Sequence, residues 1–180
     1  MVYWLVSAVV VLSVFSLIVV APVAAASGHG EVAKAIYGGF AIFCHQLPER
    51  SYFIGGHQLA VCARCTGIYG GFMFTLLLYP LIRSLRNQVF PPRSWLLLAT
   101  IPLAIDFSVN FFGFWYNTHT SRLLTGDVLG SAVVFYVMPA IIELSSRSTD
   151  KPAPRATFTL ASPERIASAP SDYSAPERRI

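Results

Sequence analysis

Four long apolar segments fill most of the first 144 residues and leave the chain few ways to fold in water. They cover residues 3–26, 59–82, 95–115 and 123–144. Because a helix of about 20 apolar residues crosses a bilayer core about 30 Å thick, each segment is long enough to span a membrane. Of the 22 charged residues (13 basic and 9 acidic), ten lie in residues 145–180, so few remain to coat a soluble domain. The sequence predicts an all-α integral membrane protein with a bundle of four transmembrane helices.

The first apolar segment has two interpretations. Three alanines at residues 24–26, just before Ser27, resemble the cleavage site of a secretory signal peptide. A signal peptide, however, begins with a positively charged region, and residues 1–4 contain no lysine or arginine. We therefore expect a retained transmembrane helix, and a three-helix bundle if the segment is cleaved.

Lysine and arginine residues gather on the cytoplasmic side of membrane proteins. The loop after the second segment and the start of the tail carry six of them: Arg83, Arg86, Arg93, Arg147, Lys151 and Arg155. Both stretches fall on the same side of a four-span protein. We predict a multi-pass protein of the cell membrane with cytoplasmic N- and C-termini, and with residues 27–58 and 113–122 facing outward.

Composition divides the chain into three parts. Residues 1–26 form the N-terminal helix or signal peptide, and residues 27–144 form a membrane domain with three transmembrane helices. Within that domain, residues 32–43 are too few to span a bilayer and are expected to form a short interfacial helix, with Gly38-Gly39 and Gly55-Gly56 as turns around it. Residues 145–180 are rich in serine, proline and charge, which predicts a disordered cytoplasmic tail.

The three cysteines of the chain lie within one stretch of 22 residues. Cys44 is followed by His45, and Cys62 and Cys65 form a Cys-x-x-Cys pair at the start of the second segment. Positions three apart share a face of a helix, so both sulfurs are expected to point the same way. The positive end of the helix dipole and the charge of Arg64 favour the thiolate form there.

Three chemistries fit this stretch. Cys44, Cys62 and Cys65 with either His45 or His57 would give a Cys₃His set, a common arrangement for zinc or another transition metal. Alternatively, Cys62 and Cys65 would exchange disulfides, with Cys44 as a third participant. In the third interpretation the cysteines form an inert disulfide or simply pack. A c-type haem is disfavoured because Thr66, not histidine, follows Cys65.

The same stretch resembles the signature of a family of prokaryotic membrane proteins catalogued as domain of unknown function 2085. The matching positions are Cys44, His45, Gln46, Pro48, Arg50, Ser51, Cys62, Arg64, Cys65, Gly67, Tyr69 and Gly70. Later positions also resemble family motifs, namely Pro102, Ile105, Asp106, Arg122, Thr125 and Gly126. The likeness covers about residues 35–140. It implies that the Cys/His stretch and the later polar residues belong to one site.

Polar residues inside the apolar segments are a second group of candidates. Asp106 is twelfth in the third segment, which predicts a position near the bilayer midplane, and Asp127 lies near Arg122 at the outer side of the fourth. Intramembrane carboxylates are costly and are usually functional or paired. We therefore consider Asp106, Asp127 and Arg122 as candidate catalytic or proton-relay residues. The alternative is a structural role, with Asp106 paired to Arg64 or Arg122.

Glycines predict how two of the helices pack. Gly67, Gly70 and Gly71 in the second segment, and Gly126 and Gly130 in the fourth, have the small-x-x-small spacing that lets helices approach closely. We predict contact between these two helices. It would bring Cys62 and Cys65 near Arg122 and Asp127.

The function favoured by these observations is structural metal binding, zinc first, by Cys44, Cys62 and Cys65, with His45 as nitrogen ligand. Arg50 and Arg64 would offset the thiolate charge. One alternative is a thiol-redox enzyme or transporter that uses Cys62 and Cys65 with the intramembrane carboxylates. Another is an accessory subunit of a larger membrane complex.

The expected partners are the lipid bilayer and a membrane protein or a second copy of the chain. The scattered charge of +4 argues against nucleic acid.

Overall fold

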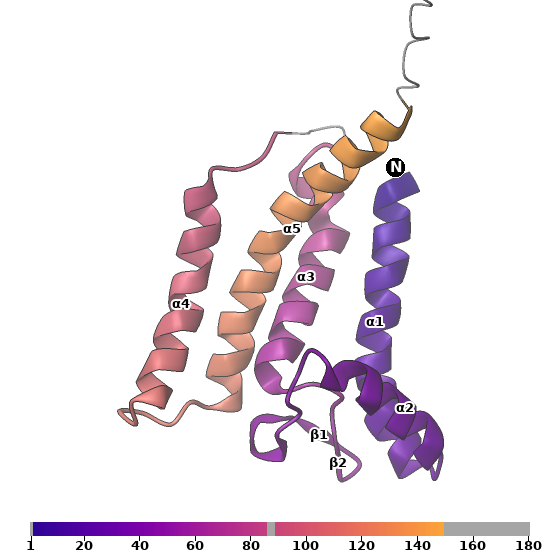
Figure 1. The fold of residues 1–180 in the computed structure, drawn as a ribbon, viewed down its shortest axis with the longest axis vertical. Helices are drawn as coiled ribbons and strands as arrows, with labels where there is room; N and C mark the ends of the chain where they lie inside the picture. Colours follow the sequence, from indigo (N-terminus) through magenta and orange to yellow (C-terminus); the bar gives the residue numbers. More distant parts are fainter. Residues whose placement is uncertain (1, 86–88, 150–180) are drawn as a thin grey trace, which may run out of the picture. The chain divides into compact units, whose positions relative to one another are not determined.

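The computed structural model describes residues 2–85 and 89–149 (Figure 1). Of the predicted disordered tail at 145–180, residues 145–149 are helical, and residues 150–180 lie outside the described residues. The elements, in chain order, are α1 Val2–Ala26, α2 Gly30–Ala41, the 3₁₀ turn η1 Pro48–Arg50, β1 Phe53–Ile54, β2 His57–Gln58, α3 Ala63–Ile82, α4 Arg93–Phe111 and α5 His119–Thr149.

Four of the helices, α1, α3, α4 and α5, are long and apolar enough to cross a membrane. They alternate in direction, so that α1 and α4 run toward one end of the bundle and α3 and α5 run away from it (Figure 1). The short helix α2, the hairpin of β1 and β2, and the loop after α4 all lie at that end. The predicted all-α membrane bundle is confirmed. The two-stranded hairpin is an addition that the sequence did not predict.

Helices α3 and α5 touch backbone to backbone, as the glycine spacing predicts. A Cβ added to Gly130 would lie 2.1 Å from the carbonyl oxygen of Ile68, and one on Gly67 would lie 2.1 Å from that of Leu123. Gly71 and Gly126 would clash in the same way, at 2.3 and 2.2 Å. Such close approach is open only to glycine. Gly70 faces α1 instead, where the ring of Phe15 lies 3.6 Å from a built Cβ.

Helix α1 is integrated into the fold. The indole of Trp4 donates a 2.8 Å hydrogen bond to the carbonyl of Leu76 in α3. Near the other end of α1, the backbone amide of Ala60 donates to the carbonyl of Ile18, and Ile18 is fully buried. These contacts connect α1 both to a spanning helix and to the segment that leads into it.

Several expected boundaries are wrong. Helix α4 ends at Phe111, not at residue 115, because Gly113 adopts a positive φ of 74° and turns the chain. Asp106 therefore lies about 6 Å along the axis from the centre of α4 and about 7.5 Å from its end. Helix α5 continues through Thr149, beyond the expected end at 144.

The two glycine pairs at the hairpin end of the bundle differ in role. Gly38 and Gly39 lie inside α2, so the predicted turn there is wrong. Gly55 and Gly56 connect β1 to β2, and both have the positive φ that favours glycine. The second predicted turn is confirmed.

A substitution that adds a single methyl group at Gly130 tests the contact between α3 and α5. We expect Gly130→Ala to lower the melting temperature of the detergent-solubilised protein, because overpacking costs about 1–3 kcal/mol. Gly38→Ala is the matched control, since a Cβ there meets nothing within 4 Å. Alanine also favours a helix over glycine by about 0.5–1 kcal/mol. If both variants melt at the same temperature, the described contact is absent.

The contacts of α1 predict that this helix is retained in the mature protein. Loss of residues 1–26 would remove the partners of Leu76 and Ala60. We expect the intact mass of protein extracted from membranes to include residues 2–26. A mature chain that begins at Ser27 would contradict this prediction.

Candidate metal centre

The three cysteines converge at the end of the bundle that carries the hairpin. Their sulfur atoms all lie within 4.8 Å of one another. Cys44 follows α2, Cys62 is the N-cap of α3, and Cys65 lies in the first turn of α3. All three are free thiols, so the structure contains no disulfide among them. Sulfurs of a tetrahedral zinc site lie about 3.8 Å apart, because each Zn–S bond is about 2.3 Å.

Gln46 fixes the loop that brings Cys44 to the start of α3. Its side-chain amide donates to the carbonyl of Tyr37 in α2 at 2.7 Å and to that of Ala60 at 2.9 Å. Its backbone has a positive φ of 50°, an uncommon conformation for a residue other than glycine. The amide of Gln58 in turn donates to the carbonyl of Gln46. Gln46 therefore connects α2, the hairpin and the segment that precedes α3.

The surroundings of the Cys44 and Cys62 sulfurs favour negative charge. The buried Cys44 sulfur accepts backbone N–H groups from Cys62 at 3.2 Å and from Gln46 at 3.5 Å. A side-chain hydrogen bond from Cys65 lowers the pKa of the Cys62 thiol to about 5. Since the thiolate is the form that binds metal or attacks a disulfide, the cluster is chemically prepared for either reaction.

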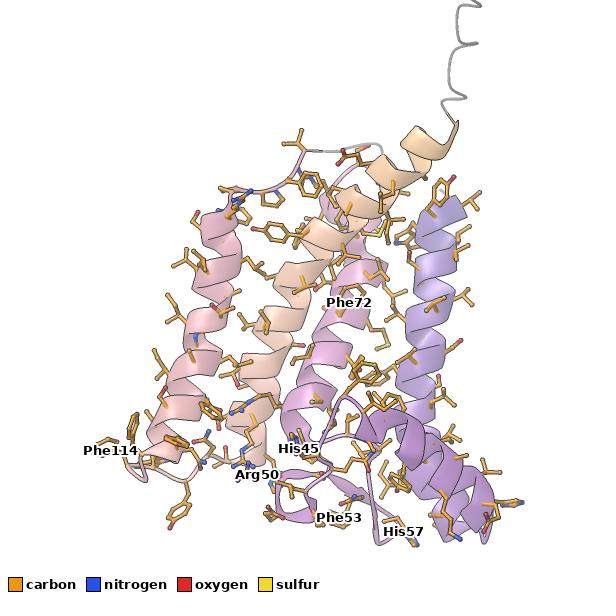
Figure 2. All side chains as sticks on the ribbon, viewed as in Figure 1. His45, Arg50, Phe53, His57, Phe72 and Phe114 are labelled. Atoms are coloured by element: carbon orange, nitrogen blue, oxygen red, sulfur yellow. The ribbon has the colours of Figure 1, made fainter. Side chains whose placement is uncertain are left out.

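The two candidate histidines lie outside the sulfur group. His45 has an exposed side chain and lines a cavity of about 390 Å³ beside the cysteines. His57 is exposed on β2, and Figure 2 places it at the outer end of the hairpin, apart from His45. Of the two, His45 is the one that shares a cavity with the sulfurs.

Asp106 is paired, as the structural interpretation of this residue expects. The guanidinium of Arg64 donates to its carboxylate at 2.5 Å, and the Asp106 side chain is 9% exposed. The side-chain amide of Asn117 donates to the backbone carbonyl of Asp106 at 2.6 Å. Arg64 therefore neutralises Asp106 directly, whereas the sequence suggested that it offsets thiolate charge.

The other two polar candidates, Arg122 and Asp127, line different cavities. Arg122 lines the same cavity as Cys62 and Cys65, as the predicted packing of α3 against α5 requires. Asp127 lies against Gly71, farther along α3, and lines a different cavity of about 680 Å³. Arg122 therefore shares a cavity with Cys62 and Cys65, whereas Asp127 does not line it, although its backbone amide lies 3.0 Å from a Cβ built on Gly67.

Two positioning residues were not predicted from the sequence. Gln46 occurs in the Cys-His-Gln motif, but no spacing rule shows that its side chain joins two distant carbonyls. Asn117 lies in the loop after α4, where a polar residue is unremarkable in a sequence. In both cases the signal is a contact made across long sequence separations.

Comparison with known proteins identifies the family. Residues 44–136 match the family described as "Predicted membrane protein (DUF2085)", and the chain belongs to this family. An uncharacterized protein of Methanocaldococcus jannaschii is 38% identical over 113 residues, which are 63% of this chain and 72% of the relative. An uncharacterized protein of Methanothermobacter thermautotrophicus is 35% identical over 105 residues, which are 57% and 93% of the two chains. No solved structure matches the chain.

The low pKa of Cys62 predicts a specific pH dependence of its alkylation. At pH values below its pKa, a thiol with a pKa of about 8.5 reacts nearly tenfold faster for each unit by which the pH is raised, because its thiolate fraction rises. Cys62 is already thiolate above about pH 5. In chelator-treated protein we expect its iodoacetamide rate, followed by peptide mass spectrometry, to change little between pH 6 and 8. If the rate instead rises about tenfold per pH unit, as it does for free cysteine in the same tube, the Cys62 thiol has an ordinary pKa.

Proposed function

We propose that this member of the DUF2085 family is a small membrane protein that holds a thiophilic metal ion, zinc first, at Cys44, Cys62 and Cys65. The observation that carries the proposal is the mutual distance of the three sulfurs, all within 4.8 Å. The N–H donors to Cys44 and the lowered pKa of Cys62 support it, because metal ligation requires thiolates. The proposed role is structural, since the ion would tie the end of α2 to the start of α3.

A tetrahedral structural site needs a fourth ligand, and we assign it to His45. Its imidazole is exposed in the cavity beside the sulfurs, so it has room to reorient. Cys₃His is a common structural zinc set. The position of His57 on the hairpin makes it the weaker candidate.

Elemental analysis with thiol counting on the same purified sample tests the site. We expect close to one metal ion per chain in the wild type, near-zero metal in Cys65→Ser, and reduced metal in His45→Ala. His57→Ala is the matched control and is expected to retain the ion. Equal, near-zero metal in the wild type and in Cys65→Ser would reject the proposal. Equal loss in both histidine variants would reject the assignment of His45.

The lowered pKa of Cys62 also favours a second function, thiol–disulfide exchange by Cys62 and Cys65. The same thiol counting distinguishes the two. Thiols that can be alkylated only after chelation indicate a metal, whereas a Cys62–Cys65 disulfide that forms and is reduced repeatedly in membranes indicates exchange.

We further propose that the cysteine end faces outward and that both termini are cytoplasmic. In the sequence, six basic residues lie in the loop after α3 and at the start of the tail, against four toward the cysteine end (Lys34, Arg50, Arg64 and Arg122), so the positive-inside rule favours this orientation. Helix α4 is the candidate surface for a partner subunit or a second copy, because its leucines at 97 and 98 are more than half exposed. Lipid would cover the same surface in a monomer.

A further inference from the structure

The cavity beside the cysteines gathers three guanidinium groups from separate parts of the chain. Arg50 comes from η1, Arg64 from α3 and Arg122 from α5. Figure 2 shows Arg50 next to His45 at this end of the bundle. The cavity has a volume of about 390 Å³, which lies in the range of small-ligand sites.

The acidic residues nearby balance only one of these charges. Asp106 binds Arg64 directly. Glu49 lies 3.8 Å from Arg50, but both side chains are largely exposed, so this contact is weak. Within residues 2–85 and 89–149, no carboxylate is paired with Arg122. The positive charges of Arg50 and Arg64 both act on Arg122, and like charges repel more strongly in a partly buried site than in water.

The cysteines do not supply the missing negative charge. With a divalent ion in place, three thiolates and the ion together carry a single negative charge, whereas Arg50 and Arg122 carry two positive ones. The exposed Glu49 beside Arg50 offsets part of the remainder, so the unbalanced positive charge is centred on Arg122.

The hydrogen-bonding groups in the cavity are mainly donors that suit an oxyanion. The Nε of Arg64 is buried and has no hydrogen-bond partner among the described residues. Asn110 and His45 add polar groups, and Phe107 and Ile68 add an apolar wall. Guanidinium groups bind phosphate oxygens in a bidentate manner. A phosphate monoester carries about −1.5 to −2 charges at pH 7, opposite in sign to the two arginines that Asp106 does not bind.

We propose that this cavity binds a phosphate group through Arg50, Arg64 and Arg122. The group belongs either to a soluble phosphate or to the headgroup of a lipid that enters from the bilayer. The site rests on the arginines and not on the proposed metal ion.

Calorimetric titration of the full chain in detergent tests the proposal with two probes. Inorganic phosphate represents the soluble source, and short-chain phosphatidic acid represents the lipid source, with the matching diacylglycerol as a phosphate-free control. We expect the wild type to bind at least one of the two phosphate probes and not diacylglycerol. Binding of inorganic phosphate assigns a soluble ligand, and binding of phosphatidic acid alone assigns a lipid headgroup.

Variants locate the binding. We expect Arg122→Gln to weaken it about tenfold or more, because one charge-assisted contact is lost. Arg93→Gln, at the opposite end of the bundle, is the matched control and is expected to bind like the wild type. Arg50→Gln provides a second test on an exposed side chain if Arg122→Gln does not fold.

Two results would overturn the proposal. One is a wild type that binds neither probe, and the other is equal affinity in the wild type, Arg122→Gln and Arg50→Gln. We expect Cys65→Ser to keep its affinity for phosphate, which separates this test from that of the metal site. Loss of binding in Cys65→Ser with normal binding in the arginine variants would place the anion on the metal and reject the arginine site.

Discussion

The backbone contact between α3 and α5 is the constraint on which the functional end of the molecule depends. Glycines at 67, 71, 126 and 130 let each helix place carbonyl oxygens where a Cβ would otherwise lie. Because hydrophobicity does not drive helix association inside a bilayer, such close packing replaces it. The first turn of α3, which carries Arg64 and Cys65, is thereby set against the first turns of α5, which carry Arg122. The cavity between them follows from that register.

A second constraint is polar and lies outside the spanning helices. Gln46 bonds to two backbone carbonyls 23 residues apart, and through them it holds Cys44 beside the N-cap of α3. The loop also has an apolar anchor, because Leu59, Ala60 and Val61 are buried in one cluster with residues of α1 and α2. Hydrogen bonds to backbone groups, which must be satisfied in any case, add directional specificity to that packing. The cysteine cluster therefore depends on an amide that is not itself a ligand.

Much of this arrangement could be predicted from the sequence because it has a local signature. Apolar length gives the spans, glycine spacing gives the contact of α3 with α5, and the clustering of cysteines gives the sulfur group. The position of Asp106 along its helix could not be predicted in the same way. Asp106 was expected near the midplane because it is twelfth in a segment of 21 residues, but a positive φ at Gly113 ends the helix earlier, so Asp106 lies off-centre in α4. The hydrogen-bond partners of Gln46 and Asn117 could not be predicted either, because these tertiary contacts leave no periodic pattern in the sequence.

The position of Asp106 also explains how α4 is held. Ala99 is the buried residue of this helix, so apolar packing contributes little to its attachment. At one end Arg64 binds Asp106, and at the other the hydroxyl of Tyr136 donates to the carbonyl of Pro92. The side chains of Arg64 and Asp106 are 22% and 9% exposed, so removal of either partner would leave a largely buried charge unpaired. The carboxylate that looks catalytic in the sequence thus has a sufficient structural role, because it fixes α4 and positions Arg64 beside the cavity.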